Sequence, residues 1–264
     1  MFTHNFDPVL INFGFITIKW YSLAYIFGII LGWWIGKKIL THVLKKTNLI
    51  FNVEDFDDLI TYLILSIIIG GRLGYVIFYN LAYYISNPSD IIKIWEGGMS
   101  FHGALIGIII GTHLFSFKKN IPTFFLLDII ACVSPIGIFL GRLANFINGE
   151  LVGKITYVSW SVVFPAVDNF PRHPSQLYEA LLEGLVLFIL LNSFILIQRY
   201  KIGMCSYLFL IFYGVFRIIS EIFREPDIQL GYFFNFLSMG TILSFFMILS
   251  GLVISIVLRK KNET

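Results

Sequence analysis

The chain has 264 residues, of which 57% are hydrophobic and only 13% are charged, with a formal net charge of +3. Soluble domains carry about 25% charged residues. This composition and a mean hydropathy of +0.82 therefore exclude an ordinary soluble globule and predict a polytopic membrane protein. No polar stretch is long enough for a second domain, so we expect one membrane-embedded domain over residues 1–264.

Seven apolar segments approach the length of about 20 residues that crosses the hydrocarbon core. The N-terminus has neither a basic region nor a cleavable apolar stretch, so the first segment is expected to remain as a helix. The predicted fold is all-α, a bundle of seven transmembrane helices with a small extracytoplasmic cap. The segments cover residues 18–40, 59–85, 103–117, 124–146, 176–198, 204–223 and 233–258.

A glycine-rich stretch, EGGMSFHG at 96–103, precedes the short third segment. We expect it to form a re-entrant loop, which is tolerated in a bilayer only where it lines a cavity or packs on protein. Within the third segment, Gly103, Gly107 and Gly111 recur every four residues. This spacing predicts close approach to another helix, although glycine is also simply frequent in membrane helices.

The basic residues predict the orientation of the bundle. Eleven lysines and arginines follow the first, third, fifth and seventh segments, which places them on one side of the membrane. Because cytoplasmic loops are enriched in such residues, that side is expected to be the cytoplasm. The N-terminus is then outside and the C-terminus is cytoplasmic.

An arginine, two asparagines and a glutamate stand at the outer end of the fourth segment, in the run GRLANFINGE at 141–150. An arginine inside a bilayer costs about 2.5–3.5 kcal/mol on insertion scales and is a functional candidate. The Arg142 guanidinium can bind phosphate through paired N–H groups. Asn145 and Asn148 can donate to ester or glycerol oxygens, while Glu150 can hold Arg142 in place. A structural Arg142–Glu150 ion pair is the alternative.

The sixth segment carries Tyr213, Arg217, Glu221 and Arg224 along one stripe. Arg217 and Glu221 are expected to pair, which lowers the cost of insertion. Two arginines directed into one cavity repel each other at low dielectric. We therefore expect an anion between Arg142 and Arg217, and in a membrane the obvious anion is a phospholipid headgroup.

Two other side chains are candidates for weaker reasons. His102 lies in the glycine-rich stretch, where a neutral imidazole can accept a proton from a nucleophile. The alternative is a loop histidine bonded to a backbone carbonyl. Tyr21 lies near the outer rim, where aromatic belts place tyrosine in any case, so a membrane anchor is its default interpretation.

The fifth segment has an acidic face formed by Gln176, Glu179 and Glu183. Acidic groups inside a membrane must pair or line water, and Arg72 of the second segment is the candidate partner. No His, Cys or Glu set has the spacing of a zinc site, and no glycine-rich loop has the context of a nucleotide site. We therefore predict no metal.

These motifs resemble those of one enzyme family. The run GRLANFINGELVG at 141–153 is similar to the signature of the prolipoprotein diacylglyceryl transferase family, G-R-x-[GA]-N-F-aliphatic-N-x-E-x-x-G, and meets every fixed position. Val152 and Lys154 stand where many relatives carry Trp and Arg, which bears on substrate preference and not on the reaction. Further blocks of the family follow in order at residues 20–21, 98–103, 172–179 and 213–227.

The resemblance implies transfer of an sn-1,2-diacylglyceryl group from phosphatidylglycerol to the thiol of a prolipoprotein's lipobox cysteine, with release of glycerol phosphate. It also implies a bacterial cell inner membrane protein whose active site faces the outer leaflet. No cofactor is expected, because the lipid is itself the activated donor. The expected partners are phosphatidylglycerol, the signal-peptide and lipobox segment of the prolipoprotein, and the lipid bilayer, with no nucleic acid.

The resemblance also suggests roles for single residues. His102 matches the family's base for the thiol, and Arg142 and Arg217 would meet the charge on the departing phosphate. Glu221 would orient Arg217, and Glu150 would orient Arg142. The expected catalytic residues are His102, Arg142, Arg217 and Glu221. The expected substrate-binding residues are Arg142, Tyr21, Asn145, Asn148, Glu150, Gly153 and Arg217.

The main alternative is a membrane transporter or channel for an anionic or lipid-like substrate, since intramembrane charges and a re-entrant loop suit that class as well. That class predicts charges across the full depth of the bilayer, whereas here they gather toward the outer leaflet. A non-catalytic lipid-binding subunit is a second alternative, and it would need the arginines but not His102.

Overall fold

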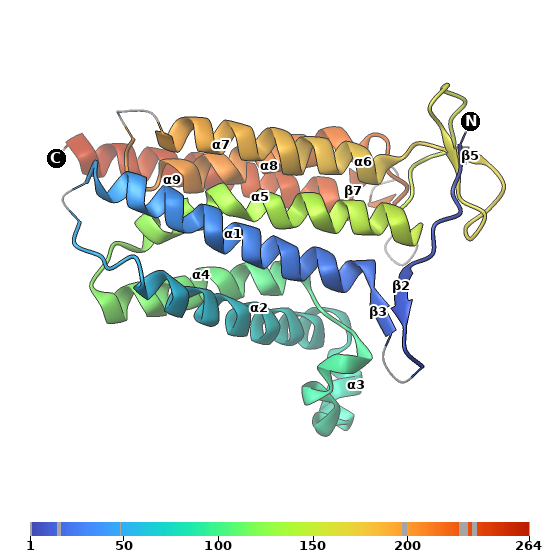
Figure 1. Ribbon diagram of the computed structural model, residues 1–264, viewed down its shortest axis with the longest axis horizontal. Coiled ribbons are helices and arrows are strands. Elements are labelled where there is room, and N and C mark those ends of the chain that lie inside the picture. Colours follow the sequence, from blue (N-terminus) through green and yellow to red (C-terminus); the bar gives the residue numbers. More distant parts are fainter. Residues whose placement is uncertain are drawn as a thin grey trace. The chain divides into compact units, whose positions relative to one another are not determined.

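The computed structural model of the chain is mostly helical (Figure 1). The described residues are 2–14, 17–47, 49–196, 200–226, 232–233 and 237–263. Asp227, in the last family block, and Gln198, at the end of the fifth predicted segment, lie outside them. The chain divides into two compact units, one comprising Met1–Ile39 with Asp128–Thr264 and the other Leu40–Leu127.

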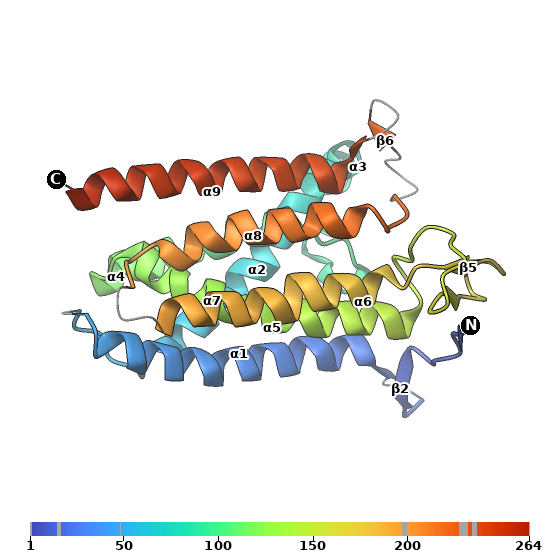
Figure 2. The same cartoon turned by 90° about the horizontal axis from the view of Figure 1, so that it is seen from above.

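The first unit contains most of the described helices. α6, η3 and α7 run on as one helix of 22 residues, of which η3 is a π-helix. Figures 1 and 2 both show α8 and α9 lying side by side. The helices are α1 (Trp20–Leu44) and α5 (Thr123–Asn148), most of each in this unit, α6 (Ser175–Glu179), η3 (Ala180–Val186), α7 (Leu187–Leu196), α8 (Met204–Glu221) and α9 (Met239–Glu263).

Short strands accompany these helices, a departure from the all-α prediction. β1 (Phe2–Thr3), β4 (Val162–Val163) and β5 (Pro171–Arg172) form one sheet in the order β1-β4-β5. The strands arise because loop backbone groups that are buried need partners, which pairing with another loop supplies. Two antiparallel pairs complete the set, β2 (Val9–Asn12) with β3 (Thr17–Lys19) and β6 (Tyr232–Phe233) with β7 (Leu237–Ser238).

The N-terminal segment is attached to the end of α5. The β1–β4 pairing is parallel, and the His4 imidazole Nε2 lies 2.7 Å from the Phe146 carbonyl oxygen. Phe146 also packs against a small buried core of Val152, Val162 and Phe164. These contacts fix the loop that follows α5 against the N-terminus.

The second unit contains α2 (Asp55–Tyr79), α3 (Leu81–Ser86), two 3-10 turns, η1 (Pro88–Ile92) and η2 (Ile94–Glu96), and α4 (Phe101–Lys119). α2 and α4 pack closely, as the glycine spacing predicts. A Cβ added to Gly103 would lie 2.8 Å from the Gly74 Cα, and one added to Gly111 would lie 2.8 Å from the Ser66 Cβ. The glycine stripe therefore has a packing role.

Six helices among the described residues are long and apolar enough to cross a membrane. α4, at 19 residues, is not one of them. Large apolar side chains on α1, α2, α4 and α9 are also exposed, which is typical of helices that face lipid. The six helices are Trp20–Leu44, Asp55–Tyr79, Thr123–Asn148, Ser175–Leu196, Met204–Glu221 and Met239–Lys260.

Three predicted boundaries were wrong. The second segment does not run to residue 85, because α2 ends at Tyr79 and a separate short helix follows. His102 does not lie in a loop: the non-helical stretch ends at Ser100, whose hydroxyl caps α4 by accepting from the Gly103 N–H at 3.2 Å. A Ser N-cap ends the loop earlier than the glycines suggested. The seventh segment starts at Met239 and not at residue 233, because β6 and β7 occupy the chain before it.

Candidate functional site

Glu150 organises the turn that ends α5. The helix stops at Gly149, whose φ of +66° is the left-handed conformation that glycine adopts most readily. The Glu150 carboxylate oxygen Oε1 accepts from Asn145 Nδ2 at 2.7 Å and from Asn148 Nδ2 at 3.4 Å. Asn145 and Asn148 therefore fix the position of the Glu150 carboxylate, and these hydrogen bonds stabilise the turn.

The start of α6 closes this turn from the other side. The Gln176 side-chain amide donates to the Glu150 carbonyl oxygen at 2.7 Å, and the Ser175 hydroxyl donates to the Leu151 carbonyl oxygen at 3.1 Å. Both residues are buried. The turn after α5 is thus attached to the helix that carries Glu179 and Glu183.

Gly153 lies where two backbone segments meet. It forms an antiparallel bridge with Arg224, and the neighbouring Lys154 N–H donates to the Phe223 carbonyl oxygen at 2.9 Å. A Cβ on Gly153 would lie 2.7 Å from that same oxygen and 2.7 Å from the His173 Cβ. Only glycine fits this close approach, which sets the positions of Lys154 and Arg224.

The central feature of the site is a cluster of buried ion pairs between three helices. Glu179 Oε2 lies 2.9 Å from Arg142 Nη1 and 2.8 Å from Arg217 Nη1. Glu183 reaches the same two arginines, at 3.2 Å from Arg142 Nη2 and 3.4 Å from Arg217 Nη1. The arginines of α5 and α8 are therefore brought together by the carboxylates of one helix.

Two more residues of α8 and its end complete the cluster. Arg217 Nη2 lies 2.7 Å from Glu221 Oε2, as the four-residue spacing predicts. Arg224 Nη1 lies 3.5 Å from Glu179 Oε2. We call these six residues the ion-pair cluster: Arg142, Arg217, Arg224, Glu179, Glu183 and Glu221.

The ion-pair cluster corrects two predictions. Arg142 pairs with Glu179 and Glu183, so the expected Arg142–Glu150 pair is wrong: Glu150 is engaged by the asparagines beside it. The repulsion between Arg142 and Arg217 is also resolved within the protein, because two carboxylates lie between them. An anionic ligand is therefore not needed to explain why the arginines are close together.

The π-helix explains why both glutamates reach the arginines. Glu179 is the last residue of α6, and Glu183 lies in η3, which follows α6 directly. A π-helix has a wider turn than an α-helix and occurs often at functional sites. Sequence analysis found the acidic face and the stripe of the sixth segment, but it did not include Glu179, Glu183 or Arg224 among the expected site residues. The signal for the two glutamates was the excess of acidic side chains in an apolar segment, and the signal for Arg224 was its place on the stripe with Arg217.

Arg72 does not pair with these glutamates. All five N–H groups of its guanidinium donate to backbone carbonyl oxygens of its own unit. Its side chain also lies over the Tyr84 ring, 5.2 Å from the centroid. The acceptors are the carbonyl oxygens of Asp90, Ile91, Lys93, Gly97 and Gly98, at 2.5–3.2 Å.

Two predicted site residues lie apart from the ion-pair cluster in the chain. His102 is the second residue of α4 and belongs to the second unit. Tyr21 is the second residue of α1, where its ring packs edge-on against Tyr25 with centroids 4.9 Å apart. The roles of both residues stay predictions.

Outside the helices, the loop that ends in β5 is stabilised by charge. The Arg172 guanidinium donates to both oxygens of Asp168 and lies 3.1 Å from the Glu225 carboxylate. The hydrogen bond from Arg172 lowers the pKa of Asp168 below its usual value. Burial lowers the pKa of His173, and the nearby Lys154 charge lowers it further. The Asp168–Arg172 pair therefore stays charged at neutral pH, whereas His173 stays neutral.

No set of three or more His, Cys, Asp or Glu side chains in the described part of the chain is arranged to hold a metal ion. What the site offers is a dense group of guanidinium donors and carboxylate acceptors in a helix bundle. Such an arrangement can stabilise a developing negative charge.

The family model described as prolipoprotein diacylglyceryl transferase matches residues 8–257. The chain belongs to the prolipoprotein diacylglyceryl transferase family. The match includes every residue of the ion-pair cluster. This family and the several apolar helices indicate a multi-pass protein of the bacterial inner membrane.

Individual relatives agree with the family match over almost the whole chain. A phosphatidylglycerol–prolipoprotein diacylglyceryl transferase of Rickettsia felis is 51% identical over 249 residues, which is 94% of this chain and 95% of the relative. The corresponding proteins of Rickettsia typhi and Rickettsia bellii are 51% and 49% identical, over 95% and 96% of this chain and over 96% and 95% of the relatives. The similarity is therefore not confined to the signature around Arg142.

Proposed function

We propose that this chain transfers the sn-1,2-diacylglyceryl group of phosphatidylglycerol to the thiol of a prolipoprotein's lipobox cysteine. The names of the relatives supply the donor and the acceptor. The observation that carries the proposal for the site is the meeting of Arg142 and Arg217 on one carboxylate, Glu179, within an apolar bundle. A transporter or a binding subunit does not explain the family match.

The reaction forms one bond and breaks another. The cysteine sulfur attacks the glyceryl carbon, a C–S bond forms, and the bond between that carbon and the phosphate oxygen breaks. The thiol proton passes to a base, for which His102 is the candidate, and glycerol phosphate leaves with the bonding electrons. A base helps because a free thiol with a pKa of about 8.5 is mostly protonated at neutral pH.

Arg142 has the donors that the leaving phosphate needs. Its side chain keeps 17% exposure, more than that of Arg217 or Arg224. A guanidinium carries five N–H groups, and the ion pairs of Arg142 with Glu179 and Glu183 engage one N–H on each terminal nitrogen. The remaining donors are already oriented by Glu179 and Glu183, so they are prearranged for the charge that develops on the phosphate.

The proposed membrane arrangement has seven spans, with α4 and its preceding loop as the short third element. The N-terminus and the ion-pair cluster face the outer leaflet in this arrangement. It is supported by the eleven basic residues that follow alternate segments. Single cysteines at the exposed positions Ser89 and Lys45 test it in a Cys132→Ser, Cys205→Ser background. An impermeant maleimide added outside should label the first and not the second, and the reverse result would invert the topology.

A transfer assay with purified protein, phosphatidylglycerol and a lipobox peptide tests the function. We expect Arg142→Ala to lower the rate by at least about 100-fold, the usual loss when a transition-state donor is removed. Arg259→Ala is the matched control, because Arg259 is exposed near the end of α9. Peptide thiol that stays free with the unaltered protein would overturn the proposed function. Full activity of Arg142→Ala would remove Arg142 from the mechanism.

A further inference from the structure

The first residues of the chain lie against the end of α5, although 142 positions separate His4 from Phe146. The Phe2 N–H donates to the Ser161 carbonyl oxygen at 3.4 Å, and the His4 N–H donates to the Val163 carbonyl oxygen at 2.8 Å. These bonds hold β1 in the sheet with β4 and β5 (Figure 1). His4 is only 8% exposed, so the N-terminal segment carries a buried imidazole to the end of α5.

Three aromatic rings surround the His4 imidazole. The ring centroids of Phe6, Phe146 and Phe164 lie 5.3, 5.6 and 5.1 Å from its centroid. A buried polar group needs a hydrogen-bond partner, and the partner is the Phe146 carbonyl oxygen, 2.7 Å from Nε2. Because a carbonyl oxygen only accepts, Nε2 carries the hydrogen. The imidazole is therefore oriented by packing and by one directed hydrogen bond.

The acceptor of this bond belongs to the turn that ends α5. The Gly149 N–H donates to the same Phe146 oxygen at 3.0 Å, and the Glu150 N–H donates to the Asn145 carbonyl oxygen at 3.1 Å. These two bonds, with Gly149 in the left-handed conformation, form the Schellman arrangement of a helix end. A carbonyl oxygen has two lone pairs, so the Phe146 oxygen accepts from Gly149 and from His4 together. His4 is thus part of the bonding of the turn.

Gly149 brings the imidazole close to the backbone of the turn. A Cβ added to Gly149 would lie 3.3 Å from His4 Cε1 and 3.5 Å from His4 Nδ1. The ring therefore covers the face of Gly149 on which a side chain would stand. The two neighbours of Gly149 are Asn148 and Glu150, whose side chains are hydrogen-bonded to each other. Contact with His4 therefore limits the movement of both.

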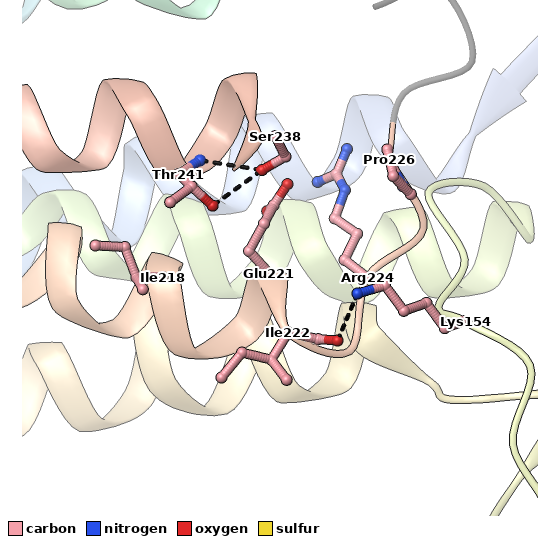
Figure 3. A pocket seen from close by; sticks show the side chains of 8 residues that line it. All are labelled: Lys154, Ile218, Glu221, Ile222, Arg224, Pro226, Ser238 and Thr241. Atoms are coloured by element: carbon pink, nitrogen blue, oxygen red, sulfur yellow. Dashed lines mark hydrogen bonds between the residues drawn. The ribbon is translucent and has the colours of Figure 1, made fainter. Parts of the chain in front are cut away.

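The chain after Glu150 is attached to other helices. The Glu150 carbonyl oxygen accepts from the Gln176 side chain of α6 at 2.7 Å. Lys154, which lines a cavity of about 320 Å³, donates through Nζ to the Ile222 carbonyl oxygen at 2.8 Å (Figure 3). The segment that carries Asn148 and Glu150 is therefore held on one side by α6 and the end of α8, and on the other by His4.

We propose that His4 is a positioning residue for diacylglyceryl transfer, acting through the Phe146 carbonyl oxygen and Gly149 to hold Asn148 and Glu150 in place. The proposal rests on the proposed function and on the predicted binding of phosphatidylglycerol by those two side chains. A role in stability alone is the alternative. Loss of position weakens lipid binding in every folded molecule and raises KM, whereas loss of stability removes folded molecules and lowers the maximal rate.

The first measurement compares two variants with phosphatidylglycerol as the varied substrate. His4→Leu removes the N–H donor and keeps an apolar side chain among the three rings. We expect its KM for phosphatidylglycerol to rise about three- to tenfold, the effect of one hydrogen bond, with kcat and the KM for the lipobox peptide unchanged. His4→Gln keeps an N–H donor at a similar reach, so its KM should match that of the unaltered protein.

The matched control is Asn192→Leu. Asn192 lies in α7, and its side-chain amide donates to the Cys132 carbonyl oxygen of α5 at 3.0 Å. The control therefore also removes a side-chain N–H that is donated to an α5 carbonyl oxygen, but away from the turn. It loses a second bond, to the Phe188 carbonyl oxygen, so its thermal stability should fall at least as much. Its KM for phosphatidylglycerol should not change.

The second measurement does not depend on transfer. Amide hydrogen exchange reports the local opening of a segment. His4→Leu should exchange faster than the unaltered protein within residues 147–151, and Asn192→Leu should not. His4→Asn, whose amide is one carbon shorter than that of His4→Gln, gives the same comparison if His4→Leu does not fold.

Three results would overturn the positioning role and leave the proposed function intact. The first is an unchanged KM in His4→Leu, and the second is a KM in His4→Gln as high as that in His4→Leu. The third is equal hydrogen exchange within residues 147–151 in His4→Leu and in the unaltered protein. Absence of all transfer by the unaltered protein overturns the proposed function instead.

Discussion

Arg72 in the second unit and Arg217 in the first are both buried arginines in helices, but their partners differ in kind. Arg72 donates all five N–H groups to backbone carbonyl oxygens. Arg217 pairs with the carboxylates of Glu179, Glu183 and Glu221. The carbonyl dipoles around Arg72 bind its guanidinium in a fixed geometry without neutralising its charge. The carboxylates around Arg217 neutralise its charge, and another anion can do the same.

The different partners of the two arginines suggest different roles, a structural role for Arg72 and a role in phosphate binding for the ion-pair cluster. The Arg72 site has every donor engaged, so it stabilises the stretch from 90 to 98 that precedes α4 and has no N–H left for a ligand. The ion-pair cluster contains three arginines and three glutamates, and Arg142 is still partly exposed. Only the second arrangement can respond to an incoming phosphate without losing its own structure.

The largest expected effect is that of Glu179→Gln, which leaves three arginines facing two carboxylates. Removing one partner of a buried ion pair costs about 3–5 kcal/mol in unfolding free energy, and we expect a loss of that size in detergent. Because phosphatidylglycerol supplies a replacement negative charge, adding it should restore part of the stability. Thermal unfolding with phosphatidylglycerol and with phosphatidylethanolamine measures this.

Glu225→Gln is the control for Glu179→Gln. Glu225 pairs with Arg172 at 3.1 Å, but its side chain is 48% exposed. Exposed pairs contribute about 0–1 kcal/mol, so the loss should be small and independent of the lipid. Equal losses in the two variants would contradict the distinction between a buried cluster and a surface pair.

The next effect compares lysine substitutions at the two sites. Arg72→Lys leaves three N–H donors for five carbonyl oxygens, and each buried carbonyl without a partner costs about 1–3 kcal/mol. We expect a clear loss of unfolding free energy and faster proteolysis between residues 90 and 98. Arg142→Lys keeps the charge opposite Glu179 and Glu183, so its stability should fall less.

The transfer activity should fall more in Arg142→Lys than in Arg72→Lys, the opposite of the order expected for stability. A lysine at position 142 loses the planar fork that binds phosphate through two N–H groups, and we expect transfer to fall by about 100-fold. The transfer rate per folded molecule, with folding checked by thermal unfolding, separates the two variants. An Arg142→Lys protein that is fully active but unstable would contradict the proposed role of Arg142 in phosphate binding and assign it a structural role.

The smallest expected effect concerns the Asp168–Arg172 pair in the loop that ends in β5. Since Arg172 lowers the pKa of Asp168, this pair stabilises the folded protein above the unfolded pKa of about 3.9. The stabilisation is lost as the pH falls through the lower folded pKa. Asp168→Asn should therefore be slightly less stable than the unaltered protein at pH 7, with the difference disappearing at acid pH. A difference that grows on acidification would contradict this.

Sequence alone predicted much of the helical layout, because apolar length and basic loop residues follow directly from the properties of the bilayer. α5 and α8 begin within one residue of the predicted segments, and Arg217–Glu221 pair as their spacing indicates. The boundaries next to loops and turns were predicted less accurately. The Ser100 cap and the β6–β7 pairing are both local contacts, and they were missed because the segment boundaries were taken from apolar composition, which does not register capping or strand pairing.

The sequence by itself determined the class of protein, the family resemblance and the presence of arginines that need partners. Only the tertiary structure decided which partners they have. Glu179 and Glu183 are separated from Arg142 by about forty residues, and a π-helical turn directs both of them to the same arginines. Electrostatic pairing depends on distance in space, and the sequence fixes that distance only through the packing of the helices.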